Sequence, residues 1–210
     1  EERNFLMNFL LVGGTQERRK LWRELFELAF PTTRIHESNN IKTGKLSYSD
    51  MVICIQPEVN LPLMEFLNEC RLDTKPVFCI IDAIDQYQSL ALIYQGVRGI
   101  VGSDASLDTL RNGIRIVKEG GLFIDPVISR TLKNNLFSYP KDAITRPKLS
   151  NTQWKVFLLY AKGVSIPETA LQLNLTSQEI QKTHQIIIKR TSTDTISEAT
   201  SLGLLQGWFT

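Results

Sequence analysis

Histidine and cysteine are the side chains most often used for catalysis and metal binding, and this chain holds few of them. The two histidines, His36 and His184, stand far apart, and no nucleophile or ligand pattern surrounds either one. The three cysteines, Cys54, Cys70 and Cys79, are odd in number and lack the CxxC spacing. We therefore expect small, buried cysteines in a reducing compartment, and we expect no enzyme, no metal site and no cofactor.

A glycine turn offers a second kind of chemistry, the binding of an anion. Residues 12–15 (Val-Gly-Gly-Thr) lie between a predicted strand and a predicted helix, where backbone N–H groups can hold a phosphate. The turn has neither the third glycine of a dinucleotide loop nor the lysine of a P-loop. A plain tight turn is the favoured interpretation, and a bound anion or nucleotide is the alternative.

A predicted helix near the C-terminus has a face of amides and amines. With Ile180 and Ile187 turned to a core, helical spacing places five polar residues on the opposite face: Gln178, Gln181, Lys182, Gln185 and Lys189. Glutamine can pair bidentately with adenine, and lysine can reach guanine or phosphate. The pattern favours contact with DNA over a face that is merely solvated.

The elements that carry these residues follow a regular order in the N-terminal two-thirds. Apolar runs at 9–12, 33–37, 51–55, 77–81 and 99–101 predict strands. Helices are predicted from about Thr15 and over 61–70, 87–94 and 107–118, whereas 39–49 has too few apolar positions for a helix. This alternation predicts an α/β fold with a doubly wound, five-stranded parallel sheet, whose ligands bind at the carboxyl ends of the strands.

Residues 5–131 resemble the receiver domain of bacterial response regulators, which has the CheY-like fold. The resemblance is closest at 96–100, 110–117 and 120–126, which follow the family's fifth strand, fifth helix and Gly-Gly exit. In that family the sheet edge holds an acidic pair, a phosphoacceptor Asp, a Thr or Ser and a Lys. These groups bind Mg²⁺ and stabilise an aspartyl phosphate.

The corresponding positions of this sequence lack that chemistry; they are Gly13, Gly14, Ile55, Ile81 and Ser103. A shift of one residue offers Gln56 and Asp82 but still supplies no nucleophile. The resemblance therefore implies a pseudo-receiver with a degenerate, non-functional phosphorylation site that binds no Mg²⁺. We expect Ile55 and Ile81 to fill this site with hydrocarbon.

The C-terminal third has a different pattern. Residues 132–147 are polar and hold two prolines, as linkers do. Beyond them, four hydroxyl residues are each followed three positions later by Glu or Gln: Ser150 and Gln153, Ser165 and Glu168, Thr176 and Glu179, and Thr195 and Glu198. Each pair predicts a capping box at a helix start. We expect a small all-α, four-helix domain over 148–210, in which Asn174 and Leu175 join the second and third helices as in a helix-turn-helix.

This third resembles the LuxR-class DNA-binding domain of NarL/FixJ-type response regulators, without gaps over 149–199. The resemblance implies that the third helix enters the major groove, with Gln181, Lys182 and Gln185 facing the bases. Glu179, Gln181 and Thr183 stand where the family commonly has Thr, Lys and His, which weakens the attraction for phosphate. We expect His184 to pack rather than contact a base. The apolar end of the fourth helix implies a homodimer and an inverted-repeat DNA site.

Composition and charge exclude several further classes of protein. With 42% hydrophobic and 22% charged residues the chain is an ordinary globular protein, which excludes fibrous and disordered classes. A net charge of +2 excludes a polycationic binder, although Lys and Arg outnumber Asp and Glu by seven to four from Arg146 onward. The apolar stretch 5–12 is too short to span a bilayer and lacks a cleavage site, so we expect a cytoplasmic protein.

Two hypotheses follow. The favoured one is an atypical, phosphorylation-independent response regulator that binds double-stranded DNA sequence-specifically as a homodimer and regulates transcription. The alternative is an adaptor whose pseudo-receiver docks a signalling or transcription protein and whose helical domain has lost specific DNA binding.

Overall fold

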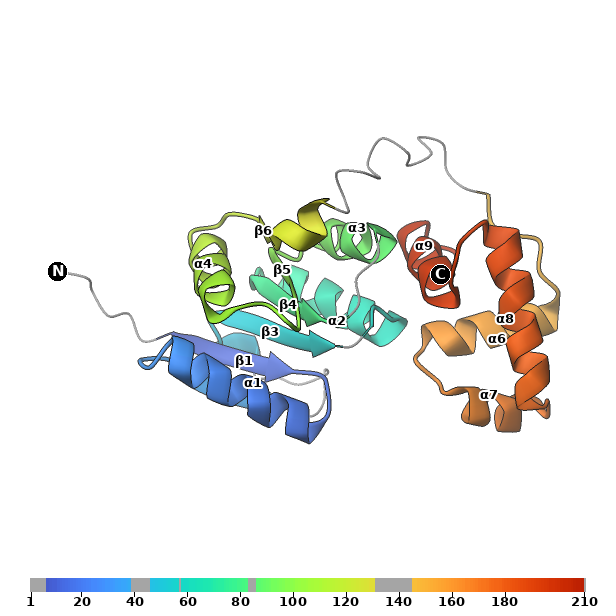
Figure 1. Cartoon of the computed structure of the whole chain (residues 1–210), viewed down its shortest axis with the longest axis horizontal. Coiled ribbons are helices and arrows are strands. Elements are labelled where there is room, and N and C mark those ends of the chain that lie inside the picture. Colours follow the sequence, from blue (N-terminus) through green and yellow to red (C-terminus); the bar gives the residue numbers. More distant parts are fainter. Residues whose placement is uncertain (1–6, 39–45, 57, 83–85, 131–144, 210) are drawn as a thin grey trace.

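Two groups of elements make up the chain in the computed structural model, which describes residues 7–38, 46–56, 58–82, 86–130 and 145–209 (Figure 1). The first group comprises β1 (Asn8–Val12), α1 (Gln16–Ala29), β2 (Arg34–Ser38), the 3₁₀ turn η1 (Leu46–Tyr48), β3 (Met51–Gln56), α2 (Leu61–Leu72), β4 (Val77–Ile81), α3 (Gln86–Tyr94), β5 (Gly99–Gly102), α4 (Leu107–Lys118) and β6 (Phe123–Ile124). The second group comprises α6 (Asn151–Ala161), α7 (Ile166–Leu173), α8 (Ser177–Thr191) and α9 (Ile196–Leu205).

The strands form one parallel sheet in the order β2-β1-β3-β4-β5-β6. The parallel α/β architecture is as predicted, but the expected count of five strands was one too low. The additional strand, β6, pairs with β5 through the N–H of Phe123, which donates to the Arg98 carbonyl at 2.8 Å. Two residues are too few to show a strand period, so the sequence pattern could not reveal β6.

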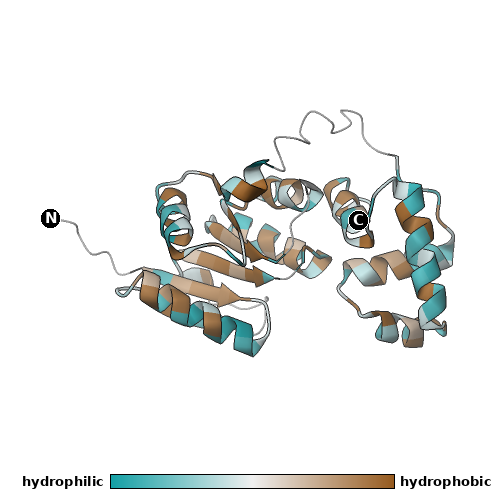
Figure 2. Cartoon of the chain, viewed as in Figure 1, coloured by the Kyte–Doolittle hydropathy of each residue, from teal (hydrophilic) through white to brown (hydrophobic). Residues whose placement is uncertain are grey.

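Each face of the sheet is covered by a pair of helices, and the core lies in two layers. In β3, Val52 and Cys54 face α2 and α3, whereas Ile53 and Ile55 face α1 and α4. This alternation explains why β3 and β4 are continuous apolar runs, since every side chain from Met51 to Ile55 is buried. Figure 2 shows these strands largely brown, with teal concentrated on the outer sides of the helices.

The two groups of elements meet at α3 and α9, which form the most extensive helix–helix contact of the described residues (Figure 1). The side-chain amide of Gln88 donates to the Ser197 hydroxyl at 2.9 Å. Leu204 and Leu205 of α9 pack against the core layer beneath α3. The apolar end of the fourth predicted helix is thus covered by the chain itself.

Some predicted segments fall partly outside the described residues. Of the stretch 39–49, which was predicted not to form a helix, residues 39–45 lie outside, and 46–48 form η1. Of the predicted linker 132–147, residues 132–144 lie outside. Within the described part of the chain, every helix is too short or too polar to cross a membrane.

Candidate functional site

The end of β1 turns sharply over the end of β3, and this turn requires glycine. Gly13 and Gly14 have φ values of +81° and +63°, in the left-handed region that side chains disfavour. A Cβ on Gly13 would also lie 2.6 Å from Nε2 of Gln56 and 2.8 Å from the carbonyl oxygen of Ile55. The two glycines are therefore needed for the close approach of β1 and β3.

The two isoleucines of the degenerate site are both buried, but on opposite faces of the sheet. Ile55 packs in the layer under α1 and α4, and Ile81 packs in the layer under α2 and α3. In the strand register, Gln56 rather than Ile55 is paired with Ile81. The expectation that these isoleucines together fill the site with hydrocarbon was wrong, because strand alternation separates them.

An ion pair occupies the sheet edge instead. Both terminal nitrogens of Arg18, on the first turn of α1, donate to the two carboxylate oxygens of Asp82, which follows β4. The Arg18 hydrogen bonds hold the pKa of Asp82 below its ordinary value, with a smaller contribution from the side chain of Ser103. The edge therefore carries its own cation, the guanidinium of Arg18.

The side chain of the neighbouring Arg19 stabilises the glycine turn through hydrogen bonds to its carbonyl groups. Its side chain is buried, and one guanidinium nitrogen donates to the carbonyl oxygens of Gly13 at 2.8 Å and Gly14 at 2.6 Å. A carboxylate oxygen of Glu37 lies 3.8 Å from its Nε. This support from Arg19 fits the interpretation of the glycines as a tight structural turn.

The side chains at this edge differ from those that phosphoryl transfer to a carboxylate requires. Ile55 has no nucleophilic atom, and the Asp82 carboxylate is engaged by Arg18. In the ranges that the structure covers, no three His, Cys, Asp or Glu side chains gather in a group that fits a metal ion. The cysteines Cys54, Cys70 and Cys79 are buried as predicted, and burial raises the pKa of Cys70 to about 12, so its thiol stays protonated.

The second candidate site is the outward face of α8. All five predicted residues, Gln178, Gln181, Lys182, Gln185 and Lys189, are exposed along this helix. The inward face buries Ile180, His184, Ile187 and Thr191. The predicted amides and amines thus lie on the exposed side of α8, opposite its buried residues.

Capping interactions fix where the helices around this face begin. Complete capping boxes are present at Ser150, Ser165 and Thr176, as predicted. At the start of α8 the Glu179 carboxylate accepts from the Thr176 N–H at 2.7 Å and from its hydroxyl at 2.8 Å. These bonds lower the pKa of Glu179, so its negative charge persists beside the polar face.

The fourth predicted box, at Thr195, is only half formed. The Thr195 hydroxyl accepts from the N–H of Glu198 at 3.0 Å, but the Glu198 carboxylate accepts from the N–H of Asp194 instead of that of Thr195. Thr195 has φ −136°, whereas the other three caps lie between −66° and −85°. This rotation of the cap explains why Glu198 reaches the preceding N–H.

His184 lies behind the polar face, as expected. Its side chain is buried, and its ring meets that of Tyr160 edge-on, with 5.2 Å between centroids. Burial lowers the pKa of His184, so the imidazole is neutral at neutral pH. His184 therefore supports α8 through packing.

No protein-family model and no curated protein matches the sequence. Among solved structures, the chain is similar to the response regulator RcsB from Salmonella enterica serovar Typhimurium bound to promoter P1flhDC with the phosphomimetic BeF₃⁻. That match has a TM-score of 0.59 and 15% identity, and it covers 95% of this chain and 99% of RcsB.

Two further structures agree with this similarity. The response regulator ChrA of a heme-sensing two-component system matches with a TM-score of 0.53 and 16% identity, covering 94% of this chain and 96% of ChrA. A LuxR-family response regulator from Aurantimonas sp. SI85-9A1 matches with a TM-score of 0.55 and 17% identity, covering 63% of this chain and 99% of its own. The chain thus has the fold of two-part response regulators of the NarL/LuxR type.

Proposed function

We propose that this chain is an atypical response regulator that binds double-stranded DNA through α8 and is not phosphorylated at its sheet edge. Residues 5–131 are the pseudo-receiver, 132–147 the linker, and 148–210 a four-helix domain in which α7 and α8 form the helix-turn-helix. The proposed role is transcription regulation by a homodimer. It includes no catalysed reaction.

The exposed face of α8 is the observation that carries the DNA-binding part. Its five long polar side chains lie on one side of a 15-residue helix, and the opposite side is anchored by Ile180, His184 and Ile187. Such a face can offer bidentate amide contacts and cationic contacts to a major groove. RcsB, which shares the fold, has been solved in complexes with DNA.

A salt-dependent binding titration tests this part. DNA fragments retained by the purified protein from a genomic library serve as the probe, read by fluorescence anisotropy against a scrambled duplex. We expect sequence-specific binding that weakens steeply with salt, and weaker binding for Lys182→Ala and Gln185→Ala. If Lys182 contacts phosphate in both copies of a dimer, its loss reduces the log–log salt slope by about 1.8.

Lys20→Ala is the matched control for these variants, because Lys20 is an exposed lysine of α1, far along the chain from α8. Its affinity and salt slope should equal those of the wild type. Equal affinity for every duplex, or full affinity in both α8 variants, would contradict recognition of DNA by this face.

Phosphorylation independence is supported by Ile55 at the acceptor position and by the Arg18–Asp82 pair at the edge. The test is an NMR titration with beryllofluoride and millimolar Mg²⁺. We expect the amide signals at the ends of β1, β3 and β4 to stay in place. Saturable shifts at the end of β3 would show that this edge still accepts a phosphoryl mimic.

The adaptor alternative is favoured by one observation on α1. Leu21 and Leu28 are 56% and 62% exposed and lie two helical turns apart, so they share one face. A partner protein at the pseudo-receiver could cover them. The same DNA titration separates the hypotheses, since an adaptor would bind all duplexes equally weakly.

A further inference from the structure

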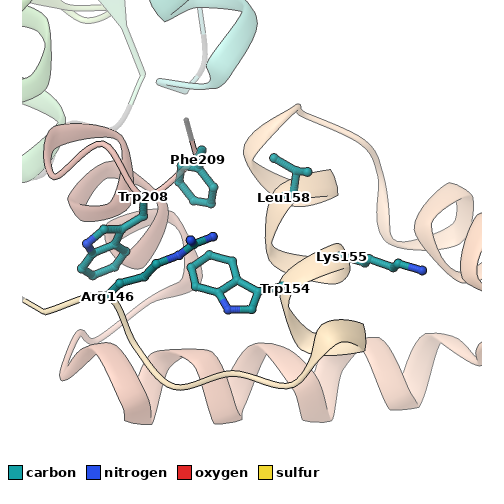
Figure 3. Close-up of a pocket in the computed structure, with 6 residues that line it drawn as sticks. All are labelled: Arg146, Trp154, Lys155, Leu158, Trp208 and Phe209. Carbon is teal, nitrogen blue, oxygen red and sulfur yellow. The ribbon is translucent and has the colours of Figure 1, made fainter.

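A small pocket lies where the segment leading into α6 meets the turn that follows α9 (Figure 3). Its volume is about 160 Å³. It is lined by three aromatic residues, one aliphatic residue and two cations: Trp154, Trp208, Phe209, Leu158, Arg146 and Lys155. The pocket belongs to neither the sheet edge nor the outward face of α8.

The aromatic walls of the pocket are held in place by the core behind them. Trp208 is buried, and the ring of Phe209 meets Phe157 edge-on at 4.9 Å between centroids. Trp154 meets Phe209 at 6.4 Å and Phe157 at 5.7 Å. Phe157 is fully buried, so it anchors the rings of Trp154 and Phe209 that contact it.

The pocket volume favours a ligand with a single ring. An apolar cavity of about 150 Å³ holds benzene, whereas pockets for drug-sized ligands measure about 300 Å³ or more. At about 160 Å³, this pocket matches the smaller class.

The charge at the pocket indicates that a bound ligand is negatively charged. The guanidinium carbon of Arg146 lies 4.1 Å from the centre of the Trp154 ring, so stacking holds this cation at the pocket. Lys155 contributes its base to the lining, whereas its side chain extends away from Arg146 and the aromatic rings (Figure 3). Among the described residues, no acidic side chain lines the pocket. Among the residues that the structure describes, no carboxylate forms an ion pair with Arg146 or Lys155.

We propose that this pocket binds a single-ring aromatic carboxylate. The ring packs against the aromatic lining beside Arg146, whose guanidinium lies next to Trp154 (Figure 3). The planar guanidinium donates N–H bonds to the carboxylate. A quaternary ammonium, which aromatic pockets also attract, is disfavoured because the guanidinium of Arg146 repels it. This binding does not depend on the proposed recognition of DNA.

Occupancy of the pocket would join two distant parts of the chain. Arg146 precedes α6, whereas Trp208 and Phe209 follow α9, the helix that packs on α3. A bound carboxylate therefore bridges the entry and the exit of the helical region. In this way a small molecule acts on α9 without any contact to the sheet edge.

The three tryptophans of the chain provide a direct test by NMR. Trp154 and Trp208 line the pocket, whereas Trp22 lies in the core between α1 and the sheet. Benzoate is titrated into the ¹⁵N-labelled full chain, and the indole N–H signals are assigned with Trp154→Phe. We expect saturable shifts for Trp154 and Trp208 and a stationary signal for Trp22.

Two matched comparisons distinguish the proposal from loose hydrophobic binding. Benzyl alcohol and phenyltrimethylammonium keep the ring but remove or invert the charge, and each should bind at least about tenfold more weakly than benzoate. Arg146→Ala should weaken the binding of benzoate by about tenfold, and Lys155→Ala should weaken this binding less. Lys162→Ala removes an exposed cation at the end of the same helix and should change nothing.

The proposal is overturned if benzoate leaves the Trp154 and Trp208 signals in place. It is also overturned if benzyl alcohol binds as tightly as benzoate, or if Arg146→Ala binds benzoate like the wild type. The unchanged Trp22 signal in each variant reports that the core under α1 is intact, and an unchanged helical circular dichroism spectrum reports the same for the helical region. Each result thus decides for or against a carboxylate site at Arg146.

Discussion

Replacing the residues of the Arg18–Asp82 pair, singly and together, tests whether this contact holds the sheet edge. The pair joins α1 to the end of β4, across 64 residues of chain. Arg18→Ala, Asp82→Ala and the double variant complete a double-mutant cycle. The cycle isolates the interaction between the two side chains from their other contacts.

The expected magnitude follows from exposure and geometry. The side chains of Arg18 and Asp82 are 22% and 41% exposed, so water screens much of their attraction. Two parallel N–H···O bonds place this pair at the strong end of exposed ion pairs. We expect a coupling free energy of about 1 kcal/mol, or about a fivefold change in the folding equilibrium.

A second pair on the same helix is the matched control. Arg23 and Glu27 form a one-turn pair at 2.9 Å, with side chains 44% and 53% exposed. Pairs of this kind contribute about 0.3 to 0.5 kcal/mol. Both cycles are measured by urea unfolding of the full chain at pH 7, followed by circular dichroism.

The pH dependence of stability gives an independent readout of the same pair. Arg18 lowers the pKa of Asp82 below the ordinary 3.8, so the unfolded chain binds this proton more readily. The contribution of the Arg18–Asp82 pair to the free energy of unfolding is therefore complete well above pH 3.8, and it is lost as pH falls through and below that value. Asp82→Asn should lack this loss. A coupling energy no larger than that of Arg23–Glu27 would refute the reasoning that an internal cation holds the edge.

Three further predictions concern the helical region. Thr176→Ala should lower the free energy of unfolding by about 1 kcal/mol because α8 loses its cap, whereas Thr176→Ser should retain most of it; urea unfolding measures both. Burial lowers the pKa of His184 below 6.5, so the unfolded state binds the proton first and stability falls as pH drops below 6.5. Urea midpoints at pH 7.5 and 5.5 should therefore differ less in His184→Gln than in the wild type. Gln88→Ala removes the bond to Ser197 and should speed amide hydrogen exchange in α9 by about fivefold, with no change in β1.

The sequence predicted the parts of the molecule whose patterns are local. The buried runs 51–55 and 77–81 became β3 and β4, since strands covered on both faces are apolar throughout. The exposed face of α8 followed from the spacing of Ile180 and Ile187, both fully buried. The spacing of buried residues and the capping residues both lie within one helix, so they can be recognised from the sequence alone.

The sheet edge was predicted only in part, because its main contact is not local. The loss of the phosphoacceptor Asp was evident from Ile55. In contrast, nothing near Arg18 in the sequence indicates that Asp82 is its partner. The Arg18-Arg19 doublet directly after the glycine turn was the available signal. The structure shows that the two arginines diverge, Arg18 to Asp82 and Arg19 to the glycine carbonyls.

The contact between α3 and α9 constrains how the proposed homodimer can form. Leu204 and Leu205 are already packed against the core layer beneath α3, and Gln88 bonds to Ser197. The same face of α9 cannot cover α3 and pair with a second copy at one time. A dimer through α9 therefore requires α9 to leave α3, whereas a dimer through another surface leaves this contact intact.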